Sequence, residues 1–183
     1  MPLLLEMKIS AIVITFNEEQ NIRAALDSLR WADEIIVVDS ESADRTVEIA
    51  RRFTDQIYVR PWPGYSAQKN FAASQASFEW IFSLDADERV SDELARELEQ
   101  IKQGSEPAAA GFEMPRLTWY LGRWIKHSGW YPDRKLRLYN RNRGRWRGDF
   151  VHEAIEVEGK VARLKGDLLH VLAPYVRTNS FAV

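Results

Sequence analysis

The sequence predicts an α/β protein with a Rossmann-like, mostly parallel central sheet flanked by helices. Two observations carry this prediction. Short unbroken apolar runs alternate with segments of helical spacing through the first part of the 183-residue chain, as they do in strand–helix–strand units. Polar residues follow directly after three of these runs, and a parallel sheet gathers such strand ends at the edge where ligands bind.

In the first part of the chain, strands and helices are expected to alternate. The run Ile9–Thr15 is apolar until its last residues, which predicts a strand buried on both faces. Asp44 and Ser91 are the residue types that cap helix N-termini, and Trp62-Pro63-Gly64 predicts a loop. The strands are expected at residues 9–15, 34–39, 56–60 and 80–84. The helices are expected at residues 18–29, 44–53, 67–77 and from Ser91 onward.

Beyond Gly104 this alternation stops. Between Trp119 and Trp146 the chain is rich in tryptophan, tyrosine, glycine and arginine. No repeat, low-complexity tract or linker divides the sequence, so residues 1–183 are expected to form a single domain. Short strands are expected at residues 111–115, 135–139 and 167–172, with a loop at 144–148.

Composition excludes several classes of protein. The formal net charge of -2 gives no electrostatic basis for general nucleic-acid binding. The chain has no cysteine, which excludes a disulfide framework and a thiolate metal site and fits a reducing compartment. The run Leu3-Leu4-Leu5 is too short for a signal-peptide core or a membrane span. The expected location is therefore the cytoplasm.

Two carboxylates directly after the strand at 80–84 form the first chemical cluster. Asp85 and Asp87 flank one small residue and are followed by Glu88. Acids this close repel one another unless a cation lies among them, and Mg²⁺ or Mn²⁺ prefers carboxylate and phosphate oxygens. The cluster predicts a divalent metal site. The alternative is a solvated acidic turn that caps the helix beginning at Ser91.

Polar residues also follow the first two strands. Asp39 ends the second strand, where an aspartate can accept hydrogen bonds from a base or a ribose. Thr15, Asn17 and Glu18 follow the first strand, where a dinucleotide-binding fold would have a glycine-rich turn. The lack of that turn counts against a nicotinamide or flavin enzyme. The alternative for these residues is a helix N-terminus, with Asn17 as its cap.

In their order, these segments resemble a known family. They are Ile-Thr-Phe-Asn-Glu-Glu at 14–19, Glu-Ile-Ile-Val-Val-Asp-Ser-x-Ser-x-Asp-Arg-Thr at 34–46, Gln-Lys-Asn at 68–70 and Leu-Asp-Ala-Asp-Glu at 84–88. The series resembles glycosyltransferase family 2. The later runs at 129–133 (Gly-Trp-Tyr-Pro-Asp), 136–138 (Leu-Arg-Leu) and 151–153 (Val-His-Glu) are similar to the branch that includes bacterial lipopolysaccharide-core glucosyltransferases. The resemblance extends from Ile9 to His170.

The resemblance implies a GT-A fold and a metal-dependent, inverting enzyme that uses a nucleotide-diphosphate sugar, here a UDP-sugar. Asp85 and Asp87 match the metal and diphosphate motif, with Asp87 as the direct ligand. Glu41 replaces the usual glycine beside the uracil pocket. Relatives often continue with a helical segment, so a chain ending at Val183 is expected to be truncated or naturally short. The residues that match nucleoside-holding positions are Thr15, Asn17, Glu18 and Asp39.

The implied mechanism needs cations near the leaving diphosphate and a base for the acceptor hydroxyl. Lys69 is the candidate cation. Asp133 and Glu153 are the candidate bases, and Asp133 is favoured because it lies about where the family places this residue. For either acid the alternative is a surface ion pair. His152 and His170 are each a candidate metal ligand or a structural hydrogen-bonding group.

The region from Trp119 to Trp146 is expected to bind the acceptor, because sugars stack on aromatic rings and anionic acceptors suit arginine. The alternative is a small aromatic core with a basic rim. Residues 1–103 are then the nucleotide-sugar-binding half and residues 104–183 the acceptor-binding half. The residues in and beside this region that would suit an anionic acceptor are Arg116, Arg123, Lys126, Arg134, Arg137, Arg141, Arg143, Arg145 and Arg147.

The leading interpretation is an enzyme that transfers a hexose, with glucose favoured, from a UDP-sugar to a lipopolysaccharide-core or related glycolipid acceptor. Peripheral contact with the inner face of the cytoplasmic membrane is expected from the resemblance and from the many basic residues. One alternative is a sugar nucleotidyltransferase, which would ordinarily show a glycine-rich phosphate loop after the first strand. Another is a noncatalytic carbohydrate- or membrane-binding module derived from a transferase.

Overall fold

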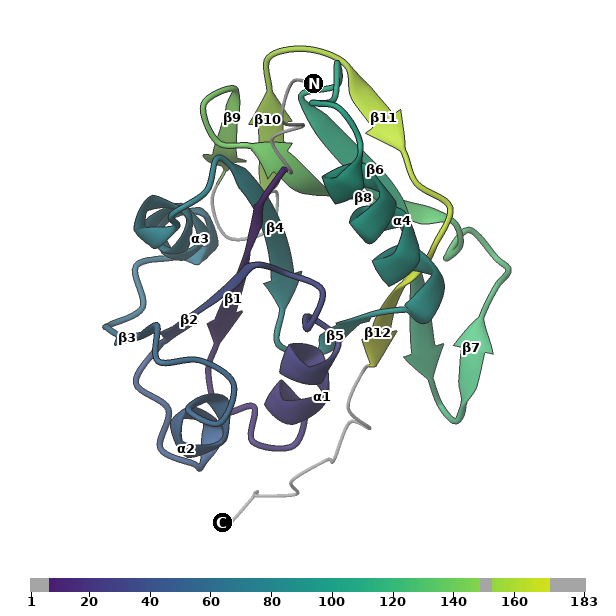
Figure 1. Cartoon of the computed structure of the whole chain (residues 1–183). Coiled ribbons are helices and arrows are strands. Elements are labelled where there is room, and N and C mark those ends of the chain that lie inside the picture. The colour runs from purple at the N-terminus through teal and green to yellow at the C-terminus, as the bar shows by residue number, and fades with distance from the viewer. Residues whose placement is uncertain (1–6, 149–152, 172–183) are drawn as a thin grey trace.

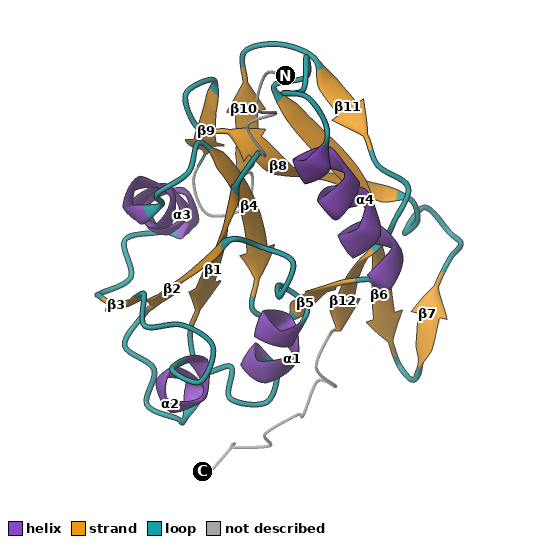
Figure 2. Cartoon of the chain, viewed as in Figure 1, coloured by secondary structure: helices purple, strands orange, loops and turns teal. Residues whose placement is uncertain are grey.

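The computed structural model describes residues 7–148 and 153–171 of the chain. It is an α/β structure, as expected, in which one large curved sheet carries helices on its faces (Figures 1 and 2). The helices are α1 (Ile22–Asp27), α2 (Thr46–Ala50), α3 (Tyr65–Gln75) and α4 (Asp92–Gln103). The strands are β1 (Ile9–Thr15), β2 (Glu34–Asp39), β3 (Ile57–Val59), β4 (Trp80–Asp85), β5 (Glu88–Val90), β6 (Gly111–Tyr120), β7 (Arg123–Ile125), β8 (Asp133–Asn140), β9 (Gly144–Arg147), β10 (Ala154–Val157), β11 (Val161–Arg163) and β12 (Leu168–Val171).

The main sheet has the order β3-β2-β1-β4-β8-β6-β12-β5, and β7 and β11 also pair with β6. Strands β3, β2, β1 and β4 are parallel. Their register places Thr15 opposite Asp39 and Ile14 opposite Asp85. The polar residues that follow the apolar runs therefore meet at one edge of the sheet, as the sequence predicts.

The sheet becomes mixed beyond β4. Strand β8 runs antiparallel to both β4 and β6, and β12 is parallel to β6 but antiparallel to β5. In the last pairing His170 lies opposite Glu88, and the backbone N–H of Val171 donates to the carbonyl of Asp87 at 3.1 Å. A late strand thus returns to the same edge as the acidic cluster.

The core lies on both faces of the sheet because strand residues alternate between them. On one face, Ile9, Ala11 and Val13 of β1 pack in a cluster with α1, α2 and α4. On the other face, Ile12 and Ile14 pack in a cluster with α3 and with the small sheet formed by β9 and β10. Within the described residues, no helix combines the length and apolar character that crossing a bilayer requires.

Several boundaries differ from the sequence-based expectation. The first helix begins only at Ile22, with Asn21 rather than Asn17 at its N-cap. Asp44 does not cap α2, whose N-cap is Arg45. The expected loop at 144–148 contains strand β9, because its backbone pairs with β10. Strand β5 was not expected. Ser91 does cap α4, accepting a hydrogen bond from the N–H of Leu94 at 3.2 Å.

Gly166 holds the start of α4 against the chain that leads into β12. A Cβ atom at this position would lie 2.3 Å from the backbone nitrogen of Leu94, which is fully buried. The N–H of Gly166 also donates to the carboxylate of Glu97 at 2.8 Å. Only a residue without a side chain allows this approach, so Gly166 fixes β12, and with it His170, relative to α4.

We expect Gly166→Ala to lower the free energy of unfolding by roughly 1 to 3 kcal/mol, the usual cost of forcing extra volume into a packed site. The measurement is urea unfolding followed by circular dichroism. Gly104→Ala is the matched control, because a Cβ there meets its nearest atoms at 3.4 Å. Equal unfolding midpoints for the two variants would contradict the close approach at Gly166.

Candidate functional site

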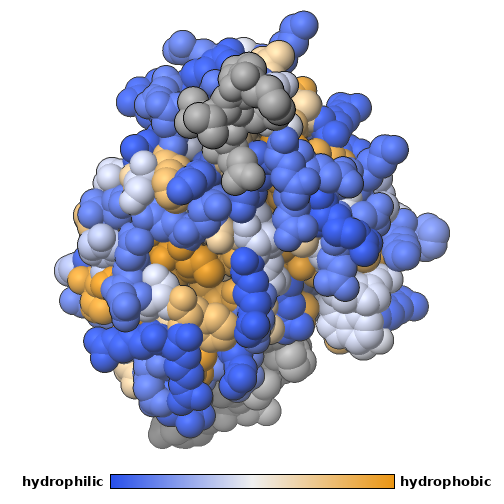
Figure 3. All heavy atoms as spheres, viewed as in Figure 1, coloured by the Kyte–Doolittle hydropathy of each residue, from blue (hydrophilic) through white to orange (hydrophobic). Residues whose placement is uncertain are grey.

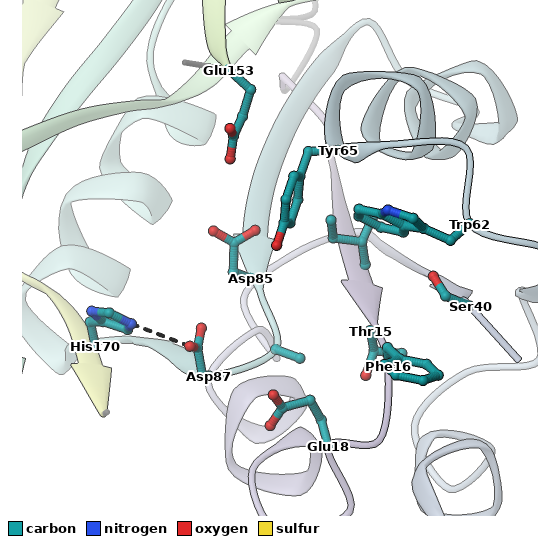
Figure 4. A pocket seen from close by; sticks show the side chains of 12 residues that line it. Thr15, Phe16, Glu18, Ser40, Trp62, Tyr65, Asp85, Asp87, Glu153 and His170 are labelled. Atoms are coloured by element: carbon teal, nitrogen blue, oxygen red, sulfur yellow. Dashed lines mark hydrogen bonds and ion pairs between the residues drawn. The ribbon is translucent and has the colours of Figure 1, made fainter. Parts of the chain in front are cut away.

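A cleft of about 650 Å³ opens at the edge of the sheet where the polar strand ends meet. Figure 4 shows acidic side chains and an imidazole along one wall and aromatic side chains along the other. Both halves of the sequence contribute to it, since Glu153 and His170 face the strand ends of the first half. The lining residues are Ile14, Thr15, Phe16, Glu18, Ser40, Trp62, Tyr65, Asp85, Ala86, Asp87, Glu153 and His170.

Asp85 is held from below by two buried cations. Its Oδ1 lies 2.9 Å from the Nζ of Lys69, and its Oδ2 accepts a hydrogen bond from Nη2 of Arg137 at 2.8 Å. Burial opposes ionisation, but Arg137 and Lys69 outweigh it and hold the pKa of the Asp85 carboxyl well below its usual range. Asp85 is therefore a fixed anion whose two oxygens already have cationic partners.

The same cations belong to a longer chain of alternating charges. Arg137 also donates to Glu88 at 2.7 Å, and Arg116 lies 3.7 Å from Glu88 while donating to Asp133 at 2.7 Å. Burial raises the pKa of Glu88, with the neighbouring Asp85 adding to the rise and Arg137 opposing it. We call this set the charge chain. It consists of Lys69, Asp85, Arg137, Glu88, Arg116, Asp133 and Lys135.

Lys69 is a buried support rather than an exposed cation. Its side chain is only 2% exposed, and its Nζ lies 4.1 Å from the ring centroid of Trp146. Burial lowers the pKa of Lys69, with the nearby charge of Arg137 adding to the effect, while Asp85 opposes it. The sequence placed Lys69 beside a diphosphate; the structure places it beneath Asp85, which it holds.

Asp87 faces the cleft on the other side of Ala86. Its Oδ2 lies 3.2 Å from the Nε2 of His170, and both residues line the cleft (Figure 4). Register brings them together, because β12 pairs with β5 and β5 begins directly after Asp87. A carboxylate oxygen and an imidazole nitrogen that converge on open space can share a divalent cation.

The loop after β2 is tied to the turn after β1 by side-chain hydrogen bonds. Asp39, fully buried, accepts from the N–H of Ser42 at 2.8 Å. Asn17 has a positive φ of 52°, and its side-chain oxygen accepts from the N–H of Ala43 at 2.8 Å. The structure therefore uses Asn17 and Asp39 to build one wall of the cleft, and neither is among the residues that line it.

Glu18 and Thr15 do line the cleft. The N–H of Glu18 donates to the hydroxyl of Thr46 at 2.8 Å, which fixes the turn. Burial raises the pKa of the Glu18 carboxyl; the charges of Asp87 and Asp44 add to the rise, while a hydrogen bond from Asn21 opposes it. A bound cation beside Glu18 and Asp87 would reduce the repulsion between these two carboxylates.

The aromatic side chains of one wall of the cleft are not among the site residues predicted from the sequence. Phe16, Trp62 and Tyr65 are exposed large side chains that line the cleft. The rings of Trp62 and Tyr65 meet edge to face, with their centroids 4.7 Å apart. For Trp62 the sequence predicts only a place in a loop. The signal was nevertheless present, because a tryptophan next to a proline and a glycine, just after a short strand, has little chance of reaching the core.

The two candidate bases occupy different environments. Glu153 lines the cleft, and Figure 4 shows its carboxylate directed into the space above Asp85. Asp133 is not among the lining residues and pairs with Arg116 and Lys135. Burial opposes ionisation of Asp133, but these two cations outweigh it and lower its pKa. His152 lies outside the described residues.

Most of the arginines in and beside the region from Trp119 to Trp146 have partners within the chain. Arg116 and Arg137 belong to the charge chain, and Arg141 donates to the carbonyls of Ala73 and Ala76. Trp146 is buried beneath Lys69. The expected aromatic and basic region is therefore not one surface. The other members with internal partners are Arg134, Arg143 and Arg147.

Comparison with known proteins gives consistent results. The family model described as Glycosyl transferase family 2 matches residues 10–157. The lipopolysaccharide core biosynthesis glycosyltransferase LpsC of Rhizobium meliloti is 34% identical over 172 residues, which cover 90% of this chain and 63% of LpsC. An uncharacterized glycosyltransferase of Rickettsia bellii is 50% identical over 99 residues, 54% of this chain and 34% of the relative. The chain thus spans less than two thirds of the length of these relatives.

Solved structures show the same fold. TarS 1-349 of S. aureus in complex with UDP-GlcNAc matches with a TM-score of 0.64 and 18% identity, over 97% of this chain and 62% of that one. Glucosyl-3-phosphoglycerate synthase of Mycobacterium tuberculosis, in complex with Mg²⁺ and UDP, matches with a TM-score of 0.58 and 16% identity, over 92% and 73%. The GT-A fold implied by the sequence resemblance is confirmed.

The charge chain makes a prediction about stability and pH. Arg137→Met would leave the buried Glu88 and the half-buried Asp85 with less compensation, so we expect a loss of roughly 3 to 5 kcal/mol in the free energy of unfolding at neutral pH. The pKa of Asp85 is lowered, so its ionised form stabilises the folded state, and this contribution is lost only when the pH falls through that pKa. The pKa of Glu88 is raised, so its ionisation lowers the free energy of unfolding as the pH rises. Arg137 offsets that cost, so the loss should shrink at mildly acidic pH, where Glu88 protonates first.

The measurement is urea unfolding of both proteins at neutral and at mildly acidic pH. Arg163→Met is the matched control, because its ion pair with Glu113 lies at the surface and should contribute less than about 1 kcal/mol. A loss for Arg137→Met that is as small as the control's, or that grows with acidification, would contradict the charge chain.

Proposed function

The chain belongs to glycosyl transferase family 2, and we propose that it is a metal-dependent, inverting transferase that moves a hexose from a UDP-sugar to a glycan or glycolipid acceptor. One observation carries the proposal. The cleft pairs an aromatic wall, suited to a nucleoside, with an acidic wall containing one carboxylate compensated by buried cations and three that face the open space. We further propose glucose as the hexose and a lipopolysaccharide core as the acceptor, which the similarity to LpsC supports.

The acidic wall supports the need for a divalent cation. Glu18, Asp87 and Glu153 would repel a donor diphosphate unless a cation lay between them. Within the described ranges, no group of three acidic or histidine side chains could hold a metal ion. Oxygens of the donor diphosphate and water would therefore supply its other ligands, as they commonly do for Mg²⁺. We propose Asp87 and His170 as the protein ligands. When bound, Mg²⁺ or Mn²⁺ would neutralise the charge that develops on the departing diphosphate.

Asp85 takes a different role in this proposal. Because Lys69 and Arg137 already occupy its two oxygens, it orients the donor and the metal site as a fixed anion and is not the main metal ligand. On the opposite wall, Phe16 and Trp62 offer ring faces for the uracil, and Thr15 and Ser40 offer hydroxyl groups. Asn17 and Asp39 would shape this wall through the Ser40–Asp44 loop.

For the base that takes the proton of the acceptor hydroxyl, we propose Glu153 in place of Asp133. A base must reach the reacting atoms and must have a pKa high enough to accept a proton. The position of Glu153 among the cleft-lining residues supports it, while the cations around Asp133 make that carboxylate a weaker base. Asp133 would then act as part of the charge chain.

We retain the assignment of residues 1–103 to donor binding and of residues 104–183 to acceptor binding, with one addition. Glu153 and His170, from the second half, line the same cleft as the strand ends of the first half. Catalysis would therefore take place where the halves meet. A glycolipid acceptor implies work at the inner face of the cytoplasmic membrane, which is part of the proposal.

The metal site is tested by thermal unfolding with UDP-glucose, with and without Mn²⁺. We expect stabilisation only when both are present, as linkage requires of a ligand that binds the folded state alone. Asp87→Ala should abolish this stabilisation. It should change the free energy of unfolding of the unliganded protein by less than about 0.5 kcal/mol, since Asp87 lines the open cleft. Asp55→Ala, an exposed acid elsewhere, is the control. Unchanged stabilisation of Asp87→Ala would remove this residue from the metal site.

The reaction and its base are tested by UDP release from UDP-glucose with Mn²⁺ and lipopolysaccharide-core acceptor. We expect Glu153→Gln to keep Mn²⁺-dependent donor binding but to lose transfer by roughly a hundredfold to ten-thousandfold, the usual contribution of a general base. Glu156→Gln, which removes a surface ion pair with Arg147, should leave the rate of transfer unchanged. If Asp133→Asn lost transfer and Glu153→Gln did not, the roles of the two acids would be reversed.

A further inference from the structure

The turn of the β6–β7 hairpin carries an exposed apolar side chain that contributes to neither the turn nor the core. Its register pairs Trp119 with Trp124 and Tyr120 with Arg123, leaving a two-residue turn of Leu121 and Gly122. Both turn residues have positive φ, 48° and 80°, a conformation that favours asparagine, aspartate or glycine. Leu121 is strained there and also 79% exposed, so its apolar side chain serves neither the turn nor the core.

Aromatic side chains surround this tip at the surface. Tyr120 and Trp130 are 40% and 44% exposed, with ring centroids 5.8 Å apart. The rings of Trp119 and Trp124 meet edge to face, with their centroids 5.2 Å apart. Both pairs lie outside the two core clusters. Tyrosine and tryptophan concentrate where an apolar phase meets water, because each has an apolar body and a polar atom.

The charge of the segment has one sign. Between Glu113 and Asp133 the sequence contains no acidic residue. Arg123 and Lys126 are exposed in and directly after β7, beside the aromatic cluster. Basic side chains next to an apolar tip complement an anionic lipid surface, which attracts lysine and arginine within a Debye length.

The hairpin lies next to the cleft. Strand β12 pairs with β6 so that His170 is opposite Thr118, and the pairing of β6 with β7 begins at that same Thr118. In Figure 1 the turn lies at the lower end of the molecule, the end to which the arrowheads of β1 and β4 also point. Figure 3 shows this lower right margin as pale rather than blue, in contrast to the surface above it. A surface touching the hairpin would lie beside the opening of the cleft.

We propose that the β6–β7 hairpin docks on an anionic lipid bilayer, with Leu121 inserted among the acyl chains, Trp124 and Trp130 at the headgroup level, and Arg123 and Lys126 against the lipid phosphates. The exposed aliphatic tip favours a bilayer over a free sugar, because stacking on a sugar needs rings alone. The idea that docking brings a lipid-borne acceptor to the cleft rests on the proposed function. Docking on the bilayer does not require the chain to be catalytically active.

The test is sedimentation of the chain with vesicles of phosphatidylcholine alone and of phosphatidylcholine mixed with phosphatidylglycerol. We expect binding to the mixed vesicles that weakens with salt, and a decrease of roughly tenfold or more in the partition coefficient for Leu121→Asp. Val161→Asp is the matched control, since Val161 is 41% exposed and its strand pairs with the opposite end of β6. Circular dichroism checks that both variants fold.

A second measurement locates the contact. Brominated phospholipid in the mixed vesicles should quench tryptophan fluorescence, with less quenching in Trp124→Phe and unchanged quenching in Trp62→Phe, an exposed tryptophan of the cleft. No binding to mixed vesicles, or equal losses in Leu121→Asp and Val161→Asp, would overturn the inference. A chain that binds vesicles through the hairpin but releases no UDP would leave it standing and count against the proposed function.

Discussion

The candidate site depends on the way Arg137 joins the half-buried carboxylate of Asp85 to the buried carboxylate of Glu88. Its guanidinium contacts Asp85 and Glu88 at once, at 2.8 and 2.7 Å, beneath the acidic edge of the sheet. Two acids this close could not both stay ionised without such a cation, because desolvation of Glu88 and mutual repulsion would favour protonation. Lys69 completes the compensation from α3. The position of Asp85, and so the spacing of the acidic wall, follows from this arrangement.

The opposite wall is built with hydrogen bonds rather than charges. Asp39 and Asn17 fix the backbone of the loop after β2, and the turn after β1 is fixed in return by the hydroxyls of Ser42 and Thr46. These bonds hold two loops in one shape before any ligand arrives, which reduces the entropy lost on binding. The aromatic rings then lie on a preformed support. Ion pairs therefore hold the acidic wall of the cleft in place, whereas hydrogen bonds hold the aromatic wall.

The second half of the chain divides its aromatic and basic residues between two tasks. Trp146 is buried against Lys69 and supports the charge chain from the side of the small sheet. Trp124 in the β6–β7 hairpin and Trp130 after it remain exposed. Arginines of the same region bind backbone carbonyls and acids inside the fold. Residues that look alike in sequence therefore differ in role, because neighbouring strands face different layers of the structure.

The sequence by itself determined the parallel strands β1, β2 and β4, the polar residues that end them and the family, because a strand buried on both faces must be apolar until it reaches the binding edge. It also identified Glu18, Asp85, Asp87, Glu153 and His170, all of which line the cleft. Only the tertiary structure decided what each residue contacts. Asp85 and Arg137 are 52 positions apart, and their contact depends on strand order and on the antiparallel pairing of β8 with β4, which no local pattern specifies. For the same reason the structure alone separated Lys69 and Asp133, both held in ion pairs, from the side chains that face the open cleft.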